Sequence, residues 1–192
     1  ELLRSAGVDF EVLRPGVGAA RRPGESPRAF AVRVAREKAR AVHARRPHAI
    51  VLAADTIVVL GTRVFGKPAG LSDARRMLRT LSGRMHEVVT GVCVSRGDRE
   101  QARAFVTRVW MATLSEARIA SYLASGEPLG KAGAYAIQGA GAALIDRISG
   151  SYSNVVGLPL RETLEMLRAV RTRRSSVRGA RGTERTARRR AR

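Results

Sequence analysis

Apolar and polar positions along the chain follow two alternating periods, which predict strands and helices in succession. Strand patterns run over residues 8–13, 49–60, 86–95, 102–111 and 142–148. Helical patterns run over residues 27–44, 73–81, 116–125 and 161–170, and the opening ELLRSAG is typical of a helix end closed by glycine. Helices interleaved with strands predict an α/β fold with a mixed sheet, into which one hairpin is inserted.

The ends of the predicted helices carry recognisable cap residues. Ser26, Ser72 and Ser115 each precede a helical pattern, and Pro27 follows the first of them, as expected at helix N-termini. Pro159 begins the last helix. These signals fix where the helices start independently of their apolar faces.

The run Ala49–Leu60 is the longest apolar stretch of the chain. It predicts a central strand covered on both faces. Because polar residues interrupt it and it is too short to cross a bilayer, we expect a soluble, one-domain protein with no membrane partner. The single cysteine, Cys93, excludes a disulfide framework and favours a cytoplasmic location.

The net charge of +20 is unevenly distributed. Residues 171–192 hold ten arginines against one glutamate, so this tail carries +9 of the excess. Because it has almost no large apolar side chain, we expect a folded domain over residues 1–170 and a disordered basic tail over residues 171–192. The charge also suggests a nucleic-acid binding protein, but 4% aromatic residues and no recognisable binding motif argue against specific nucleic-acid recognition.

Lysine is rare in this chain. Of 36 basic residues only Lys38, Lys67 and Lys131 are lysines. An ammonium is a compact point charge, whereas a guanidinium is a wide planar fork, so a tight phosphate pocket accepts the first and excludes the second. The retained lysines are therefore candidates for phosphate contact, with chance survival in an arginine-biased chain as the alternative.

Asp55 interrupts the apolar run, where an ionised carboxylate is costly unless a metal ion or a cation compensates it. With Thr56 beside it, the pair presents an acid and a hydroxyl where a strand end meets a cleft. The alternative is an aspartate at a strand end that backbone amides satisfy.

Two glycine-containing segments carry the remaining candidates. Gly66-Lys67-Pro68 sets a lysine on a rigid turn within reach of a phosphate, or else forms an ordinary exposed turn. In residues 126–139, dense glycines allow backbone amides to approach a ligand, Lys131 adds charge, and the Gln138 amide both donates and accepts, which complements a pyrimidine edge. The three histidines show no metal-ligand spacing, and no Walker loop or serine elbow occurs.

Taken in order, AADTIVV, GKP, LSGRMHEVVTGV and SGEPLGKAGAYAIQGAGAALIDRISGSYSNVVGLPL resemble the Maf family of nucleoside triphosphate pyrophosphatases. The likeness runs from residue 1 to about residue 170, and AYAIQG and GSYSNVVGLP favour the dTTP/UTP branch over the one acting on 7-methyl-GTP. It implies an elongated α/β fold with flanking helices and a cleft between two lobes, similar to the inosine triphosphate pyrophosphatases. It also implies a cytoplasmic protein that is often a homodimer.

The resemblance implies hydrolysis of dTTP and UTP to the monophosphate and pyrophosphate, and house-cleaning of non-standard nucleotides, with Mg²⁺ or Mn²⁺ as cofactor. Asp55 would be the catalytic acid/base and a metal ligand. Lys67 and Lys131 would bind phosphate, and Thr56 and Gln138 would select the base.

The chain departs from the family pattern in three places. The family's opening S-x-S-P-R-R loop does not occur, so we expect a missing upstream segment. Gly18 and Ala19 stand where the family usually has an acidic pair, and Gly130 where it has aspartate. We therefore expect slower hydrolysis than in a member with these groups. A catalytically weakened, nucleotide-binding regulator of cell division is the alternative.

Overall fold

A five-stranded sheet forms the centre of the computed structural model, which describes residues 1–18 and 20–171. The strands lie in the order β2-β1-β3-β4-β5 and comprise β1 (Val51–Leu60), β2 (Arg63–Phe65), β3 (Met85–Arg96), β4 (Arg99–Met111) and β5 (Ile145–Ser149). The helices are α1 (Leu2–Ser5), α2 (Pro27–His43), α3 (Leu71–Leu81), α4 (Glu116–Ala124), α5 (Tyr152–Val156) and α6 (Leu160–Arg171). Two short 3₁₀ helices, η1 (Ala132–Ala134) and η2 (Gly139–Leu144), lie between α4 and β5. After Arg171, the predicted basic tail lies outside the described residues.

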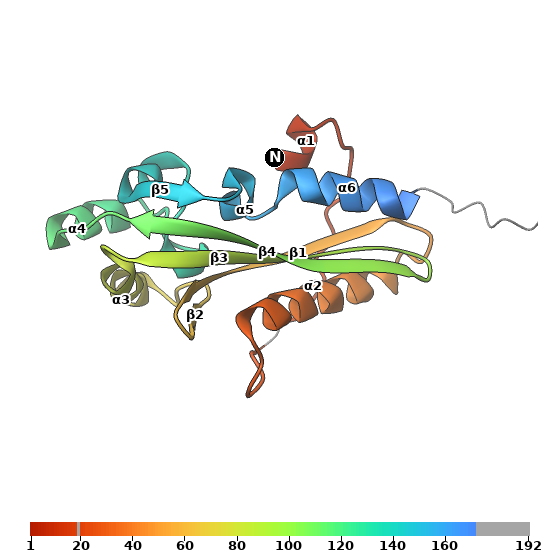
Figure 1. Cartoon of the computed structure of the whole chain (residues 1–192), viewed down its shortest axis with the longest axis horizontal. Helices are drawn as coiled ribbons and strands as arrows, with labels where there is room; N and C mark the ends of the chain where they lie inside the picture. Colours follow the sequence, from red (N-terminus) through yellow and green to blue (C-terminus); the bar gives the residue numbers. More distant parts are fainter. Residues whose placement is uncertain (19, 172–192) are drawn as a thin grey trace, which may run out of the picture.

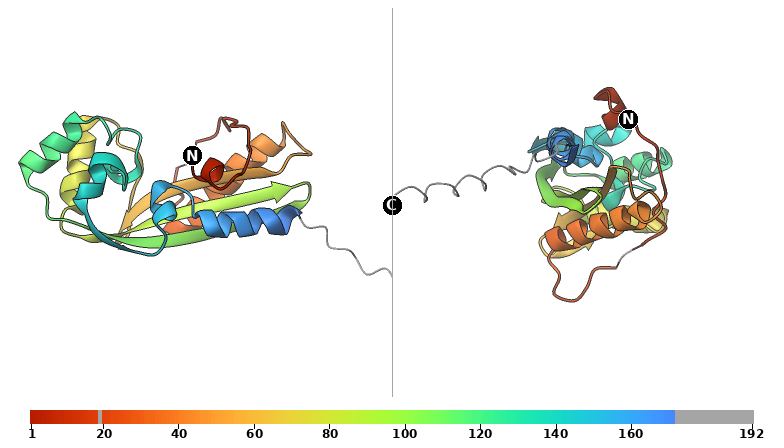
Figure 2. Two further views of the ribbon diagram at one scale, coloured as in Figure 1. Left: turned by 90° about the horizontal axis from the view of Figure 1, so that it is seen from above. Right: turned by 90° about the vertical axis from the view of Figure 1, so that its right-hand side faces the viewer.

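The molecule is elongated, with helices on both faces of a long twisted sheet (Figure 1). Helix α2 runs along one face and α6 along the other, while α3, α4 and β5 gather at one end, which gives the molecule two lobes (Figures 1 and 2). The predicted elongated α/β fold is therefore confirmed. All four pairings between the described strands are antiparallel, so they do not include the parallel pairs implied by a mixed sheet. The two-residue turns that join β1 to β2 and β3 to β4 connect only antiparallel neighbours.

Strand β1 is covered on both faces, as the sequence predicts. Ile57 and Val59 pack against the α2 face together with Val34, whereas Leu52 and Ala54 pack on the α6 side. Successive side chains point to opposite faces of the sheet, so each layer of helices receives alternate residues of the strand.

Two of the three predicted serine caps are confirmed. The Ser26 and Ser115 hydroxyls accept hydrogen bonds from the third residue beyond each, at 3.2 Å. The prediction for Ser72 is wrong, because α3 begins one residue earlier and Gly70 is its N-cap. In the first turn of α3, the Asp73 carboxylate accepts from the Ala69 N–H, which precedes the helix, at 3.0 Å.

The predicted strand at residues 8–13 is wrong. These residues belong to no described strand, and Phe10 and Val12 are exposed. Alternation creates an apolar face, but a strand also needs a neighbour to bond its backbone. Only the second half of the predicted strand 142–148 is β structure, and α5, capped by Ser151, is an additional element.

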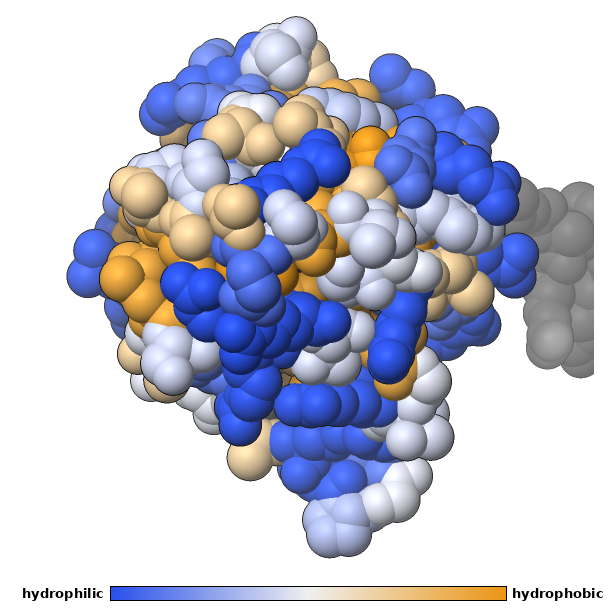
Figure 3. Space-filling view, turned by 90° about the vertical axis from the view of Figure 1, so that its left-hand side faces the viewer, coloured by the Kyte–Doolittle hydropathy of each residue, from blue (hydrophilic) through white to orange (hydrophobic). Residues whose placement is uncertain are grey.

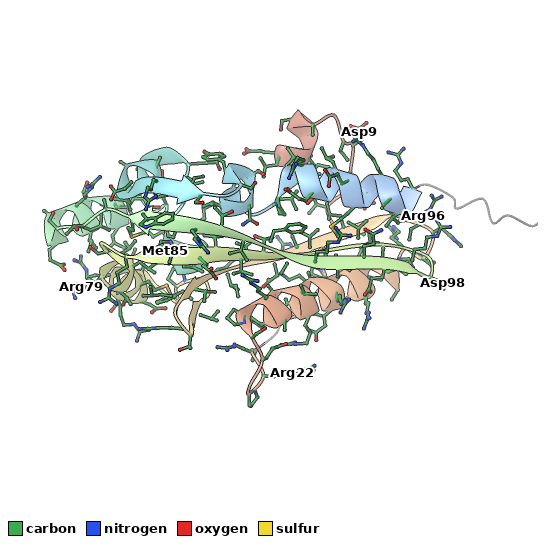
Figure 4. The ribbon with its side chains drawn as sticks, in the orientation of Figure 1. Asp9, Arg22, Arg79, Met85, Arg96 and Asp98 are labelled. Carbon is green, nitrogen blue, oxygen red and sulfur yellow. The ribbon has the colours of Figure 1, made fainter. Side chains whose placement is uncertain are left out.

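The surface is strongly polar. At the end that carries α3 and α4, a band of hydrophilic side chains crosses the face, with apolar patches beside it (Figure 3). Arg75 and Arg79 of α3 pair there with Glu116 of α4. Arg79 lies at this end and Asp98 at the opposite one, on the tip of the β3–β4 hairpin (Figure 4). In the described ranges, no helix combines the length and apolar character needed to span a membrane.

Candidate functional site

A cavity of about 330 Å³ lies beside β1, where the glycine-rich segment and the end of α5 approach that strand. Asp55, Thr56, Lys67, Lys131 and Gln138, the five residues singled out in the sequence, all line it. The structure therefore brings together candidates that lie up to 83 positions apart, between Asp55 and Gln138.

The cavity borders an open edge of the sheet. Strand β2 pairs only with the last three residues of β1, which leaves residues 51–57 unpaired on that side among the described strands. Leu60 and Arg63 close a two-residue turn, so the backbone of Leu60 points toward β2. By alternation the N–H and C=O groups of Thr56 and Ala54 point to the same side, into the cavity.

Asp55 points toward α2 and meets Lys38 there. The Lys38 Nζ atom lies 2.6 Å from Asp55 Oδ1 and donates also to the Ala54 carbonyl at 3.3 Å. Both side chains are largely buried, with 26% and 19% of their surface exposed. The carboxylate is therefore compensated by a lysine and not by backbone amides, as a partly buried charge requires.

Lys38, to which the family resemblance assigned no role, also lines the cavity. All three lysines of the chain therefore meet at one place. The signal that finds Lys38 is the retention of lysine in a chain whose other 33 basic residues are arginines. What the sequence does not contain is its contact with Asp55, which depends on how α2 packs on β1.

Lys67 and Lys131 approach the cavity on two loops that are bonded to each other. The Gly133 N–H donates to the Gly66 carbonyl at 3.0 Å. Gly133 has φ +70°, and a Cβ there would lie 2.9 Å from Val58, so glycine is needed for this approach. Neither lysine forms an ion pair with a described residue, and Asp55 is the only acidic residue of the lining, so the cavity carries an excess of positive charge.

Thr56 and Gln138 differ in how far their side chains are engaged. The Thr56 hydroxyl lies 2.9 Å from that of Thr90 and 3.3 Å from the Gly157 carbonyl, so protein groups already occupy it. Gln138 is exposed, and its amide has no hydrogen-bond partner among the described residues. The glutamine side chain is therefore the one available to a ligand.

A buried histidine contacts one of the residues that line the cavity, Tyr135. The Tyr135 hydroxyl lies 2.7 Å from Nε2 of His86, whose side chain is 1% exposed. Burial lowers the pKa of His86 to about 4, so the ring is neutral near pH 7 and supports Tyr135 without titrating there. No sequence pattern indicates this pair, because its members lie 49 positions apart.

The fold and the cavity define an α/β protein with a cationic, ligand-sized site. Residues 1–170 match the family model described as Maf-like protein, and the chain belongs to the Maf family. It is 53% identical to the dTTP/UTP pyrophosphatase of Anaeromyxobacter dehalogenans strain 2CP-C, over 88% of this chain and 87% of that protein. It is 52% identical to the dTTP/UTP pyrophosphatase of Symbiobacterium thermophilum, over 87% and 86% of the two chains. The protein of the same name from Geobacter sulfurreducens is 49% identical, over 88% and 90%.

Proposed function

We propose that this protein hydrolyses dTTP and UTP to the nucleoside monophosphate and pyrophosphate. The observation that carries the proposal is the meeting of three lysines, one aspartate and a free glutamine amide at one cavity. The names of its relatives support the same reaction and favour neither a cell-division regulator nor a nucleic-acid binding protein.

Lys67 and Lys131 bind the triphosphate in this proposal. Both stand on glycine-containing loops that are tied together, and both lack an ion-pair partner among the described residues, so their charge is available to an anionic ligand. The ammonium group suits a confined site where several phosphate oxygens must be approached at once.

Asp55 acts on the attacking water. Its carboxylate takes a proton from the water while the water oxygen bonds to the α-phosphorus, and the bond from that phosphorus to the bridging oxygen breaks, so pyrophosphate leaves. Lys38, whose Nζ atom lies 2.6 Å from Asp55 Oδ1, fixes the orientation of the carboxylate. Lys38 therefore serves as a positioning residue for Asp55.

The residues present fit a divalent cation that arrives with the nucleotide. Within residues 1–18 and 20–171, no group of three or more His, Cys, Asp or Glu side chains could hold a metal ion alone. Mg²⁺ is commonly bound by one or two carboxylates together with substrate phosphates, and Asp55 supplies one carboxylate beside the expected phosphate position. When bound, Mg²⁺ or Mn²⁺ would neutralise charge on the triphosphate.

Gln138 and the backbone of Thr56 select the base. The glutamine amide offers a donor and an acceptor to the alternating edge that uracil and thymine share, and the Thr56 main chain faces the same cavity. The engaged Thr56 hydroxyl supports a role for that residue through its position and main chain.

A cytoplasmic homodimer is the form in which we expect the enzyme to work. The buried free thiol of Cys93 is compatible with a reducing compartment. Sedimentation velocity across a range of protein concentrations measures the assembly state, and a purely monomeric species would contradict the expected dimer.

The reaction is tested by measuring pyrophosphate release from dTTP, UTP, CTP and GTP with Mg²⁺. We predict that Asp55→Asn lowers kcat by about two to four orders of magnitude with the fold intact, because the amide cannot accept the proton. Asp98→Asn, on the hairpin tip far from the cavity, is the matched control and should retain the parent rate. Orthophosphate release, or an Asp55→Asn rate within a few-fold of the parent, would contradict the proposal.

A further inference from the structure

The Glu127 carboxylate accepts hydrogen bonds from the backbone that follows Gln138. Its Oε1 accepts from the Ala140 N–H at 2.9 Å and its Oε2 accepts from the Gly141 N–H at 3.1 Å. These two bonds hold the first turn of η2, whose N-cap is Gln138 itself. The backbone just beyond the base-facing glutamine is therefore fixed by one carboxylate.

The Tyr122 hydroxyl is hydrogen-bonded to the backbone just before Gln138. Its hydroxyl oxygen accepts from the Ala136 N–H at 3.1 Å, and the hydroxyl lies near enough to Glu127 to lower the pKa of that carboxyl. Burial raises the pKa of Tyr122 to about 12, so the hydroxyl stays protonated near pH 7. Residues on both sides of Gln138 are thus tied to one Tyr122–Glu127 pair.

The fit between this pair and the loop leaves no spare room. A Cβ on Gly139 would lie 2.3 Å from Glu127 Oε1, and one on Gly141 would lie 2.3 Å from the Ala136 carbonyl oxygen and 2.7 Å from the Tyr122 hydroxyl. Gly139 also has φ +63°. The two glycines therefore allow the loop to close tightly around the carboxylate.

The pair is itself anchored on a packed element. Tyr122 belongs to α4, whose Ile119, Tyr122 and Leu123 are buried in the largest apolar cluster. The Ala140 and Gly141 N–H groups lower the pKa of Glu127, so the bonds that it accepts are charge-assisted. Neither Tyr122 nor Glu127 lines the cavity, so they act on a ligand through residues that do, namely the loop around Gln138 and Lys131, whose charge also lowers the pKa of Glu127.

We propose that Tyr122 and Glu127 are positioning residues for base selection, which hold the Gln138 amide where it meets the pyrimidine edge. This rests on the proposed function of the cavity, and assigns the discrimination among bases to a pair outside it. Chemistry on the phosphates depends on Asp55 and the lysines, so loosening the pair should weaken selectivity before it slows turnover.

The test compares Glu127→Gln, Tyr122→Phe and Gln138→Ala, with Glu116→Gln as the matched control. Glu116 is another glutamate that accepts hydrogen bonds, but it belongs to α4, its donors are Arg75 and Arg79 of α3, and it lies away from the loop. We expect the ratio of kcat/KM for dTTP over CTP to fall roughly tenfold in Glu127→Gln, because one charge-assisted bond is lost and an NH₂ group faces an N–H. The kcat for dTTP should stay within a few-fold of the parent, and Glu116→Gln should match the parent in both.

A double variant isolates the route through Gln138. If Glu127 acts on the base through that side chain, adding Glu127→Gln to Gln138→Ala leaves selectivity where Gln138→Ala alone put it. Losses that multiply, or a Glu127→Gln enzyme with parental selectivity and only a lower Tm, would overturn the proposal. Tyr122→Phe removes a single hydroxyl and carries the test if Glu127→Gln does not fold, and failure of both to fold would also overturn it.

Binding separates this proposal from the proposed reaction. The Kd values of non-hydrolysable α,β-methylene UTP and CTP are measured calorimetrically for the parent and Glu127→Gln. If the parent releases no pyrophosphate but prefers the UTP analogue, and Glu127→Gln removes that preference, the positioning role stands while the reaction fails. If the parent hydrolyses dTTP but shows no base preference in rate or binding, the positioning role is contradicted while the proposed reaction stands.

Discussion

At the scale of single residues, one neighbouring side chain stabilises the charged aspartate of the cavity. Asp55 tolerates its partly buried position because Lys38 lies against it, and Lys38 is held in turn by the Ala54 carbonyl. The rarity of lysine makes all three lysines noticeable in the sequence. It cannot reveal which of them pairs with Asp55, since the partners are 17 positions apart on different elements.

Replacing Lys131 by arginine keeps the charge but widens the head group. We predict that kcat/KM for dTTP falls by about tenfold, because a planar fork cannot take the place of a compact ammonium in a confined phosphate site. Arg75→Lys, a swap of the same two residue types at an exposed ion pair of α3, should leave the rate unchanged. A Lys131→Arg enzyme as fast as the parent would mean that lysine survives there by chance.

His86 makes the stability of the protein depend on pH. Its folded pKa of about 4 lies below the ordinary value of 6.5, so the unfolded chain binds the proton first as the pH falls. Its contribution is therefore complete above about pH 6.5 and is lost progressively toward pH 4, which amounts to about 2 kcal/mol between pH 6.5 and 5.

Urea unfolding at several pH values measures this slope. We expect His86→Gln to be less stable at pH 7 because it disturbs a buried contact with Tyr135, yet to lose less stability than the parent on going to pH 5. Equal slopes in parent and variant would assign the pH dependence to other groups.

Among the elements, α2 and the sheet approach each other unusually closely. Gly91 of β3, the register partner of Asp55, lies directly under α2, and a Cβ there would lie 2.2 Å from the Ala31 carbonyl oxygen. The missing side chain lets the helix settle on the sheet. The same helix carries Lys38 to Asp55 two turns further along.

Gly91→Ala should push α2 away from the sheet. Overpacking of this kind costs about 1–3 kcal/mol, so we predict a loss of unfolding free energy in that range and, because Lys38 moves with the helix, a lower kcat as well. Gly18→Ala, where nothing lies within 4 Å of the added carbon, is the control and should change stability by less than about 0.5 kcal/mol. Parental stability in Gly91→Ala would show that the helix shifts freely.

Elements set by local signals could be predicted, and those set by distant partners could not. Ser26 and Ser115 cap their helices because the cap bond spans only three residues. Residues 8–13 carry a strand pattern without a strand, because the pattern records an apolar face and not the neighbour that would complete a ladder. The Ser72 prediction is wrong because α3 begins at Leu71, which places Ser72 inside the helix and leaves Gly70 as the N-cap.

At the scale of the whole molecule, the site exists only through the fold. Helix α2, strand β1, the loop after β2 and the glycine-rich segment each bring one charged group to the cavity. Resemblance to the Maf family predicts from the residues alone that four further site residues accompany Asp55, whereas periodicity predicts no more than an α/β sheet. Neither the resemblance nor the periodicity predicts the Tyr122–Glu127 and His86–Tyr135 pairs, because the order of motifs does not determine which side chains meet in the fold.

The convergence of every lysine on one cavity has a chemical corollary. Apart from the terminal amine, the primary amines that react with acylating or Schiff-base-forming reagents are confined to the walls of that cavity. Lysine acetylation of this protein, at whichever of the three lysines it occurs, would remove a positive charge from this cavity. Labelling with an amine-reactive mass tag would therefore report whether the cavity is occupied. A bound nucleotide would protect the lysines from the reagent, and the arginines of the surface would not react.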